Sequence, residues 1–289
     1  MRHEAHTGWV TTEGETLFYE VRGPADGTPL LLIAPGGGDG WQYAWLADEL
    51  ADEYKVITYD RRANGRSTLH GPQNFTLGQQ SRDAVAVLHA AGESSAYVFG
   101  NSSGAVIALE LATSQPQAAR AVVAHEAPLP RLLPDARKWQ RFFAGVYLTA
   151  YRWGASLAAL QFMLGAQLPV GALIKATKGV NQHQAQSAEP YLSARTATEV
   201  LVELELLPVT NYLPDVAVIK ANGVPVVVGV GQWALAKQTW YVRAAQILAE
   251  MLGRPVVTFP GHHGAFMDQP SEFAAALRQV LQEMETVTV

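Results

Sequence analysis

The chain has 289 residues, of which 48% are hydrophobic and only 16% are charged, so it can bury a sizeable core and is not expected to be disordered. A formal net charge of −5, without any run of lysines or arginines, argues against a nucleic-acid partner and against binding to an anionic membrane surface. The absence of cysteine excludes disulfides, a thiol nucleophile and thiolate metal sites.

The first part of the chain alternates short β-rich runs with helical patterns, which predicts a mainly parallel sheet. The expected strands are Leu17–Arg22, Leu30–Ala34, Lys55–Tyr59, Ala96–Gly100 and Ala121–Ala124. The expected helices are Trp41–Ala51, Leu77–Ala91 and Ala105–Thr113. The first two helices stand where right-handed crossovers between parallel strands require them.

This alternation stops after the strand at Ala121–Ala124. From 129 to 213 the sequence is helical in composition and rich in aromatic residues, without a clear strand. The alternation then resumes with strands at Val224–Val230 and Pro255–Phe259 and with helices at Trp240–Leu252 and Pro270–Glu285. We therefore expect an α/β core domain formed by residues 1–128 and 214–289, interrupted by a helical cap at 129–213.

One stretch needs to be compared with a membrane span. The segment Trp153–Ile174 carries no charge and is long enough to cross a bilayer. It also contains Gln161, Gln167 and Pro169, which favour a pair of short helices over an apolar pocket. Met1–Val10 lacks the apolar run of a signal peptide, so we expect an unexported, cytoplasmic protein without a membrane span.

The candidate nucleophile is Ser102, in the G-x-S-x-G sequence Gly100–Gly104 between an expected strand and an expected helix. This motif needs small residues two positions before and after the serine, because the strand turns sharply into the helix. The helix start also offers free backbone N–H groups to a developing oxyanion, and Ser103 is the natural donor. The alternative interpretation of the motif is an ordinary Ser/Gly-rich helix cap.

A second oxyanion donor is expected from the glycine-rich loop after the strand Leu30–Ala34. Gly37 is our first choice there, with Gly36 and Gly38 as alternatives. The same glycines could in principle bind a phosphate, but neither the Walker lysine nor the dinucleotide fingerprint is present.

The candidate base is a histidine after the last strand, where His262 and His263 stand side by side. We favour His263, because it lies seven residues before Pro270, which opens the last helix, and His262 is the alternative. A metal site at this pair is the competing interpretation, but no third ligand stands at a recognisable spacing.

The orienting acid is missing from its usual position after the next-to-last strand, since no aspartate or glutamate occurs between Asp215 and Glu250. Glu126, which follows the strand Ala121–Ala124, keeps the chain order Ser, Glu, His and is our candidate. It could instead be a solvated loop acid or a partner of His125. Asp268 is the reserve candidate. Asp60 is expected to pair with an arginine at the exit of its strand.

These motifs together resemble the α/β hydrolase fold superfamily over the whole chain: the loop Pro35–Gly38, the segment Asp60–Ser67, the serine turn and the His263 loop follow the family order. The resemblance implies a mainly parallel sheet flanked by helices, with a helical cap after the strand that follows the nucleophile's helix. GNSSGA followed by HEAP is similar to zearalenone lactonases, which carry their acid on a glutamate after the same strand. The family's usual glycine is replaced here by Ala63.

The expected activity is therefore a serine hydrolase that cleaves a carboxylic ester or lactone with a Ser102–His263–Glu126 triad. The aromatic insertion favours a largely apolar small-molecule substrate, unless its rings only pack the cap's own core. Candidate substrate contacts are Gly36, Trp139, Tyr151, Trp153, Phe162 and Trp233. No cofactor and no metal are implied, and the oligomeric state stays open, a homodimer included.

Two other classes of function remain compatible with the sequence. A cofactor-independent lyase or oxygenase could use the same fold and the same Ser–His pair for proton abstraction. A non-catalytic ligand-binding protein would explain the vacant acid position. An epoxide hydrolase or haloalkane dehalogenase is disfavoured, because both need a carboxylate where Ser102 stands.

Overall fold

The computed structural model describes residues 4–68, 70, 75–184 and 195–287. Its strands form one sheet of eight in the order β1-β2-β4-β3-β5-β6-β7-β8. Neighbouring strands are parallel from β4 through to β8, while β2 pairs antiparallel with both β1 and β4. The strands are β1 His6–Thr12, β2 Glu15–Arg22, β3 Thr28–Ile33, β4 Tyr54–Tyr59, β5 Ala96–Asn101, β6 Ala119–His125, β7 Val226–Gly231 and β8 Val257–Phe259. The predicted mainly parallel α/β sheet is confirmed.

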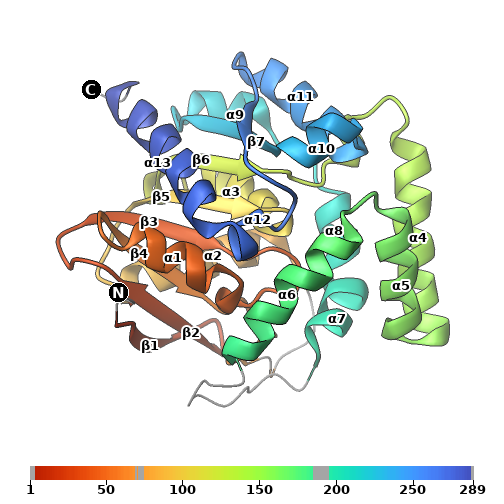
Figure 1. Cartoon of the computed structure of the whole chain (residues 1–289), viewed down its shortest axis with the longest axis horizontal. Coiled ribbons are helices and arrows are strands. Elements are labelled where there is room, and N and C mark those ends of the chain that lie inside the picture. The colour runs from red at the N-terminus through yellow and green to blue at the C-terminus, as the bar shows by residue number, and fades with distance from the viewer. Residues whose placement is uncertain (1–3, 69, 71–74, 185–194, 288–289) are drawn as a thin grey trace.

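Helices cover both faces of this sheet, as the continuous apolar runs in its central strands require. In β3, Leu30 and Leu32 point to one face while Leu31 and Ile33 point to the other, and all four are fully buried. One face packs against α2 Leu77–Ala90, α3 Ser103–Ser114 and α11 Trp240–Leu252. The other packs against α1 Ala44–Leu50, α12 Ala265–Asp268 and α13 Pro270–Val287 (Figure 1).

The helical insert follows β6, as predicted, and its helices lie together on the side of the molecule away from both labelled termini (Figure 1). They are α4 Ala136–Trp153, α5 Ala155–Gly165, α6 Val170–Gln184, α7 Ala197–Glu199, the π-helix η4 Val200–Glu205 and α8 Leu206–Thr210. Two further short helices, α9 Val216–Ala221 and α10 Gln232–Lys237, flank β7 in the chain. The division into a core of 1–128 and 214–289 and a cap of 129–213 stays a prediction.

The charge-free stretch Trp153–Ile174 is divided between the end of α4, the whole of α5 and the start of α6. Gly154 and residues 166–169 separate these helices, so the predicted pair of short helices is confirmed. None of the helices in the described part of the chain combines the length and the apolar composition that a membrane span needs.

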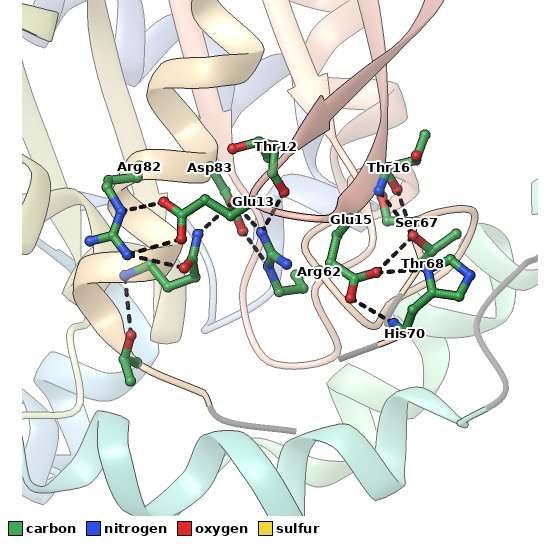
Figure 2. A network of polar contacts seen from close by, with 12 residues as sticks. Thr12, Glu13, Glu15, Thr16, Arg62, Ser67, Thr68, His70, Arg82 and Asp83 are labelled. Carbon is green, nitrogen blue, oxygen red and sulfur yellow. Dashed lines mark hydrogen bonds and ion pairs between the residues drawn. The ribbon is translucent and has the colours of Figure 1, made fainter. Parts of the chain in front are cut away.

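Buried arginines fix the loop that leaves β4. Arg66 forms a two-pronged pair with Asp60, with nitrogen–oxygen distances of 2.7 and 2.9 Å, so the expected pairing of Asp60 with an arginine is confirmed. Arg62 lies 2.7 Å from Asp83 of α2, and Figure 2 shows this pair beside the exposed pair of Arg82 and Glu13. Ala63, which lies between Arg62 and Arg66 in the chain, has a φ of 69°, which explains why a glycine would suit this position.

Candidate active site

Ser102 stands on a strained turn between β5 and α3. Its backbone has a φ of 55° and a ψ of −120°, outside the regions that non-glycine residues normally occupy. A Cβ atom on Gly100 would lie 2.2 Å from Gly104 O, and one on Gly104 would lie 2.0 Å from Ile33 O. Both flanking residues therefore have to be glycine for the turn to close and to hold Ser102 at the edge of the sheet.

His263 follows β8 and lines the same cavity as Ser102. Gly261, two residues before it, has a φ of 71°, a left-handed conformation that glycine adopts without strain. The His263 Nδ1 atom lies 2.5 Å from Glu126 Oε2, a short hydrogen bond between a largely buried ring and a fully buried carboxylate. This contact leaves Nε2 as the ring nitrogen that is free to exchange a proton at the cavity.

Glu126 reaches the histidine from the end of β6. Its Oε1 atom accepts a hydrogen bond of 2.8 Å from the backbone N–H of Gly231, and its own N–H donates to Gly229 O at 2.9 Å. Burial by itself would raise the pKa of Glu126, but the hydrogen bond from His263, the neighbouring imidazoles and the Gly231 N–H hold it below its usual value. Glu126 is therefore a carboxylate at neutral pH.

The carboxylate of Glu126 lies against the end of β7, which explains how the site can lack an acid after that strand. A Cβ atom on Gly231 would be only 3.0 Å from Glu126 Oε1. Strand β6 neighbours β7 in the sheet, so a side chain from the end of β6 needs to cross one strand spacing to arrive there. The solvated-loop interpretation of Glu126 is wrong, because 1% of the residue is exposed.

The two reserve candidates pair with each other instead of joining this group. His262 Nε2 lies 3.2 Å from Asp268 Oδ2, and His262 Nδ1 accepts a hydrogen bond from the Gly264 N–H. Neither His262 nor Asp268 is among the residues that line the cavity. Both nitrogens of His262 are therefore occupied away from Ser102.

The loop after β3 folds into a tight turn beside Ser102. The Gly38 N–H donates to Pro35 O at 2.9 Å, so this N–H is already used and Gly38 is a poor oxyanion donor. Gly37 has a φ of 89°, while Gly36 rather than Gly37 is among the residues that line the cavity. Ser103 also lines it, and as the first residue of α3 its N–H has no acceptor within the helix.

The cavity over Ser102 has a volume of about 220 Å³ and is mostly apolar. Of the described residues that line it, Glu126, His263 and Tyr241 are the ionisable ones. Most of the other lining residues are apolar, and those that come from the insert after β6, from α11 and from α12 are Phe143, Phe162, Met163, Ala166, Leu168, Leu173, Leu201, Leu206, Val209, Trp240, Phe266 and Met267.

Only part of the expected substrate contacts reach this cavity. Gly36 and Phe162 line it, but Trp139, Tyr151, Trp153 and Trp233 do not. Trp139 is buried in the core, where its ring lies 5.0 Å from that of Trp240 between centroids. Along α4 the buried face is Trp139, Phe143, Val146 and Ala150, and this leaves Tyr151 and Trp153 on the solvent side, 82% and 74% exposed.

The aromatic pair Trp240 and Tyr241 at the start of α11 also lines the cavity, although neither residue was predicted as a substrate contact. It follows Thr239, whose hydroxyl caps the helix by accepting from the Val242 N–H. Strand β7 ends at the same edge of the sheet as the serine turn, and α11 is the second helix after it, so the first residues of α11 could have been considered.

In the described ranges, no group of three or more His, Asp or Glu side chains is placed to hold a metal ion.

His125, next to Glu126, should make the free energy of unfolding depend on pH in the acid range. It is fully buried, its Nδ1 lies 2.6 Å from Asn101 Oδ1, and the rings of Phe99, Phe259 and Phe273 surround it. Burial lowers the pKa of His125 to about 4, against a partial opposing effect of the Glu126 charge. In the unfolded chain His125 takes up a proton near pH 6.5, whereas in the folded protein it stays neutral down to about pH 4. The free energy of unfolding is therefore unaffected by this group above pH 6.5 and decreases as the pH falls from 6.5 towards 4.

We therefore expect the unfolding free energy of the wild type to fall between pH 7.5 and 4.5 by about 2 kcal/mol more than that of His125→Gln. Urea unfolding of both proteins at the two pH values measures this difference. Equal losses in the two proteins would show that His125 does not stay neutral in the folded state.

Comparisons with known proteins agree with this architecture. A model described as the alpha/beta hydrolase family matches residues 30–276. The chain is 28% identical over 285 residues to the "Uncharacterized hydrolase YraK" of Bacillus subtilis, covering 96% of this chain and 97% of that protein. Among solved structures, a thermophilic esterase from Thermogutta terrifontis superimposes with a TM-score of 0.72 at 19% identity, covering 97% and 99% of the two chains. The enol-lactonase from Burkholderia xenovorans LB400 gives 0.71 at 17%, covering 95% and 100%.

Proposed function

The chain belongs to the alpha/beta hydrolase family, and from this premise we propose that it is a serine hydrolase acting on a carboxylic ester or a lactone. The observation that carries the proposal is the joint placement of three residues. Ser102 and His263 line one cavity, and His263 is bonded through Nδ1 to the buried carboxylate of Glu126. A nucleophile and a base in one cavity, together with an acid that orients the base, are the groups that acyl transfer needs.

In the proposed mechanism, the Ser102 hydroxyl attacks the carbonyl carbon while His263 Nε2 takes its proton. The negative charge that develops on the carbonyl oxygen is stabilised by the N–H of Ser103 and by an N–H of the Gly36–Gly37 loop. His263 then returns the proton to the departing alkoxide, and water attacks the acyl-enzyme by the same route. Glu126 keeps the imidazole in the Nδ1–H tautomer and stabilises the imidazolium form.

The lining of the cavity favours a neutral, largely apolar substrate. Apart from Glu126 and His263, its described wall offers no charged side chain that could pair with an ionic group of a substrate. Relatives of similar architecture include proteins described as an esterase and an enol-lactonase, and both reactions are acyl transfers to water. The similarity of the segments around Ser102 and Glu126 to zearalenone lactonases adds macrolactones to the substrates to be tried.

Labelling with a fluorophosphonate tests the proposal most directly, followed by a screen of acyl esters and one aryl macrolactone. We expect covalent modification at Ser102 and turnover of at least one ester or lactone class. A wild-type protein that is neither labelled at Ser102 nor active on any of these substrates would favour a lyase, an oxygenase or a non-catalytic binding protein.

The preference for large substrates should depend on Phe162, which lines the cavity from α5. We expect Phe162→Ala to lower kcat/KM for a bulky acyl ester by about tenfold or more, since burying a phenylalanine contributes about 1.5 to 3 kcal/mol. Acetate esters, whose small acyl group has little apolar surface to bury, should lose much less. Trp153→Ala is the matched control, because its ring belongs to the cap but is exposed. An equal loss on both substrates in Phe162→Ala would assign the ring to the cap's own packing.

A further inference from the structure

A buried ion pair joins the cap to the core beside the active site. Arg61 follows β4, and Glu205 ends the π-helix η4, 144 residues later in the chain. Arg61 Nη2 lies 2.8 Å from Glu205 Oε1, and neither side chain is exposed to solvent. Because both charges lose their hydration, a pair of this kind adds little net stability compared with apolar side chains of similar volume. The residues around the pair indicate a second role for it.

The guanidinium of Arg61 also holds the loop that follows β3. The same Nη2 atom donates a second hydrogen bond, of 2.7 Å, to Pro35 O. The backbone N–H of Arg61 donates to Gly38 O, also at 2.7 Å. One residue thereby holds both ends of the turn that contains Gly36 and Gly37, and so fixes the direction of the N–H groups in that turn.

The cap residues near Glu205 rest on the same turn and also form the wall of the cavity. Leu201, in the same π-helix, packs on the backbone of Gly36, where an added Cβ would lie 2.9 Å from Leu201 Cδ1. Leu201 and Leu206, which flank Glu205, both line the cavity. π-Helical turns are rare and occur frequently at functional sites. The wall that a substrate would touch and the loop that would face its carbonyl oxygen are thus joined through one guanidinium group.

We propose that Arg61 and Glu205 are positioning residues: they hold the Pro35–Gly38 turn in a fixed relation to the cap, so that its oxyanion donor stays aligned with Ser102. This inference rests on the proposed serine hydrolase function. An oxyanion donor acts mainly on the transition state, so its displacement lowers kcat while KM changes little. A purely structural pair would change the melting temperature without this division between kcat and KM.

The test replaces both partners by apolar residues, Arg61→Met together with Glu205→Leu, which leaves no buried charge unpaired. The matched control is Arg62→Met with Asp83→Leu. This neighbouring buried pair connects the same loop to α2 instead of to the cap (Figure 2). We expect the first double variant to fold and to lose about tenfold or more in kcat on a good ester, with KM within about threefold. The control should keep kcat within about twofold.

The inference is overturned if the folded Arg61→Met/Glu205→Leu protein keeps kcat within about twofold of the wild type, or if the control pair loses as much. Should the double variant fail to fold, Glu205→Asp decides: it keeps both charges but shortens the reach to Arg61, and unchanged kcat there would equally overturn the inference. Labelling of the wild type at Ser102 separates the two proposals. If the wild type is not labelled at Ser102, the proposed hydrolase function is rejected. If it is labelled normally but kcat is unchanged in the variants, only the positioning role is rejected.

Discussion

Ser102→Ala should lower kcat by at least about 10³ to 10⁴, because the residues of a catalytic triad act as a unit and lose their effect together. Alanine meets the same backbone strain as serine at a φ of 55°, so the substitution should leave the fold and the melting temperature close to those of the wild type. His263→Ala should cost a similar factor, and the double variant should be little worse than either single one. Initial rates on the best ester of the screen measure this.

Ser114→Ala is a suitable control, since Ser114 lies at the other end of α3 and its hydroxyl bonds to Glu110 O, far from the cavity. Its kcat should match that of the wild type. If Ser102→Ala retained more than about a tenth of the activity, covalent catalysis at this residue would be refuted, and a proton-transfer role of His263 alone would have to be considered.

Glu126→Gln should lower kcat by at least about 10², for a reason that the contacts of this side chain make specific. Oε1 of Glu126 accepts from a backbone N–H that cannot change its role, that of Gly231. A glutamine must therefore keep its oxygen there and present its NH₂ group to His263 Nδ1. The imidazole is then forced into the tautomer with hydrogen on Nε2, which cannot accept the Ser102 proton.

Asp268→Asn is the matched comparison, because Asp268 also bonds to a histidine of the same loop, but to His262. We expect it to lose less than about tenfold. Circular dichroism and thermal unfolding establish that both variants are folded. The opposite ranking of the two losses would move the orienting acid from Glu126 to Asp268.

Features that depend on local sterics could be predicted from the sequence. The turn at Ser102 needs glycine at 100 and 104 whatever the rest of the fold, because an added Cβ there meets backbone atoms. The parallel sheet followed from apolar runs alternating with helical patterns, since strands buried on both faces have to be apolar throughout. Strand β1 was missed for the same reason: it lies at the sheet edge, half exposed, and has no such run.

Glu126, the proposed orienting acid, depends on both the sequence and the tertiary structure. It could be chosen as the candidate from the sequence, since the stretch between Asp215 and Glu250 contains no carboxylate and Glu126 follows a strand. The geometry of its contact with His263, 2.5 Å between Nδ1 and Oε2, was decided by the tertiary structure, because the two residues are 137 apart in the chain and meet only through the neighbouring positions of β6, β7 and β8 in the sheet.

Contacts between the cap and the core were decided by the tertiary structure alone. Aromatic content marked the cap as a place for substrate contacts, but helix rotation decides which rings face inward, and it turns Tyr151 and Trp153 to solvent while Phe162 lines the cavity. Arg61 and Glu205 carry no motif that links them. Two charges can be buried there only because each offers the other a partner, and that pairing exists only once the cap has packed on the loop after β3.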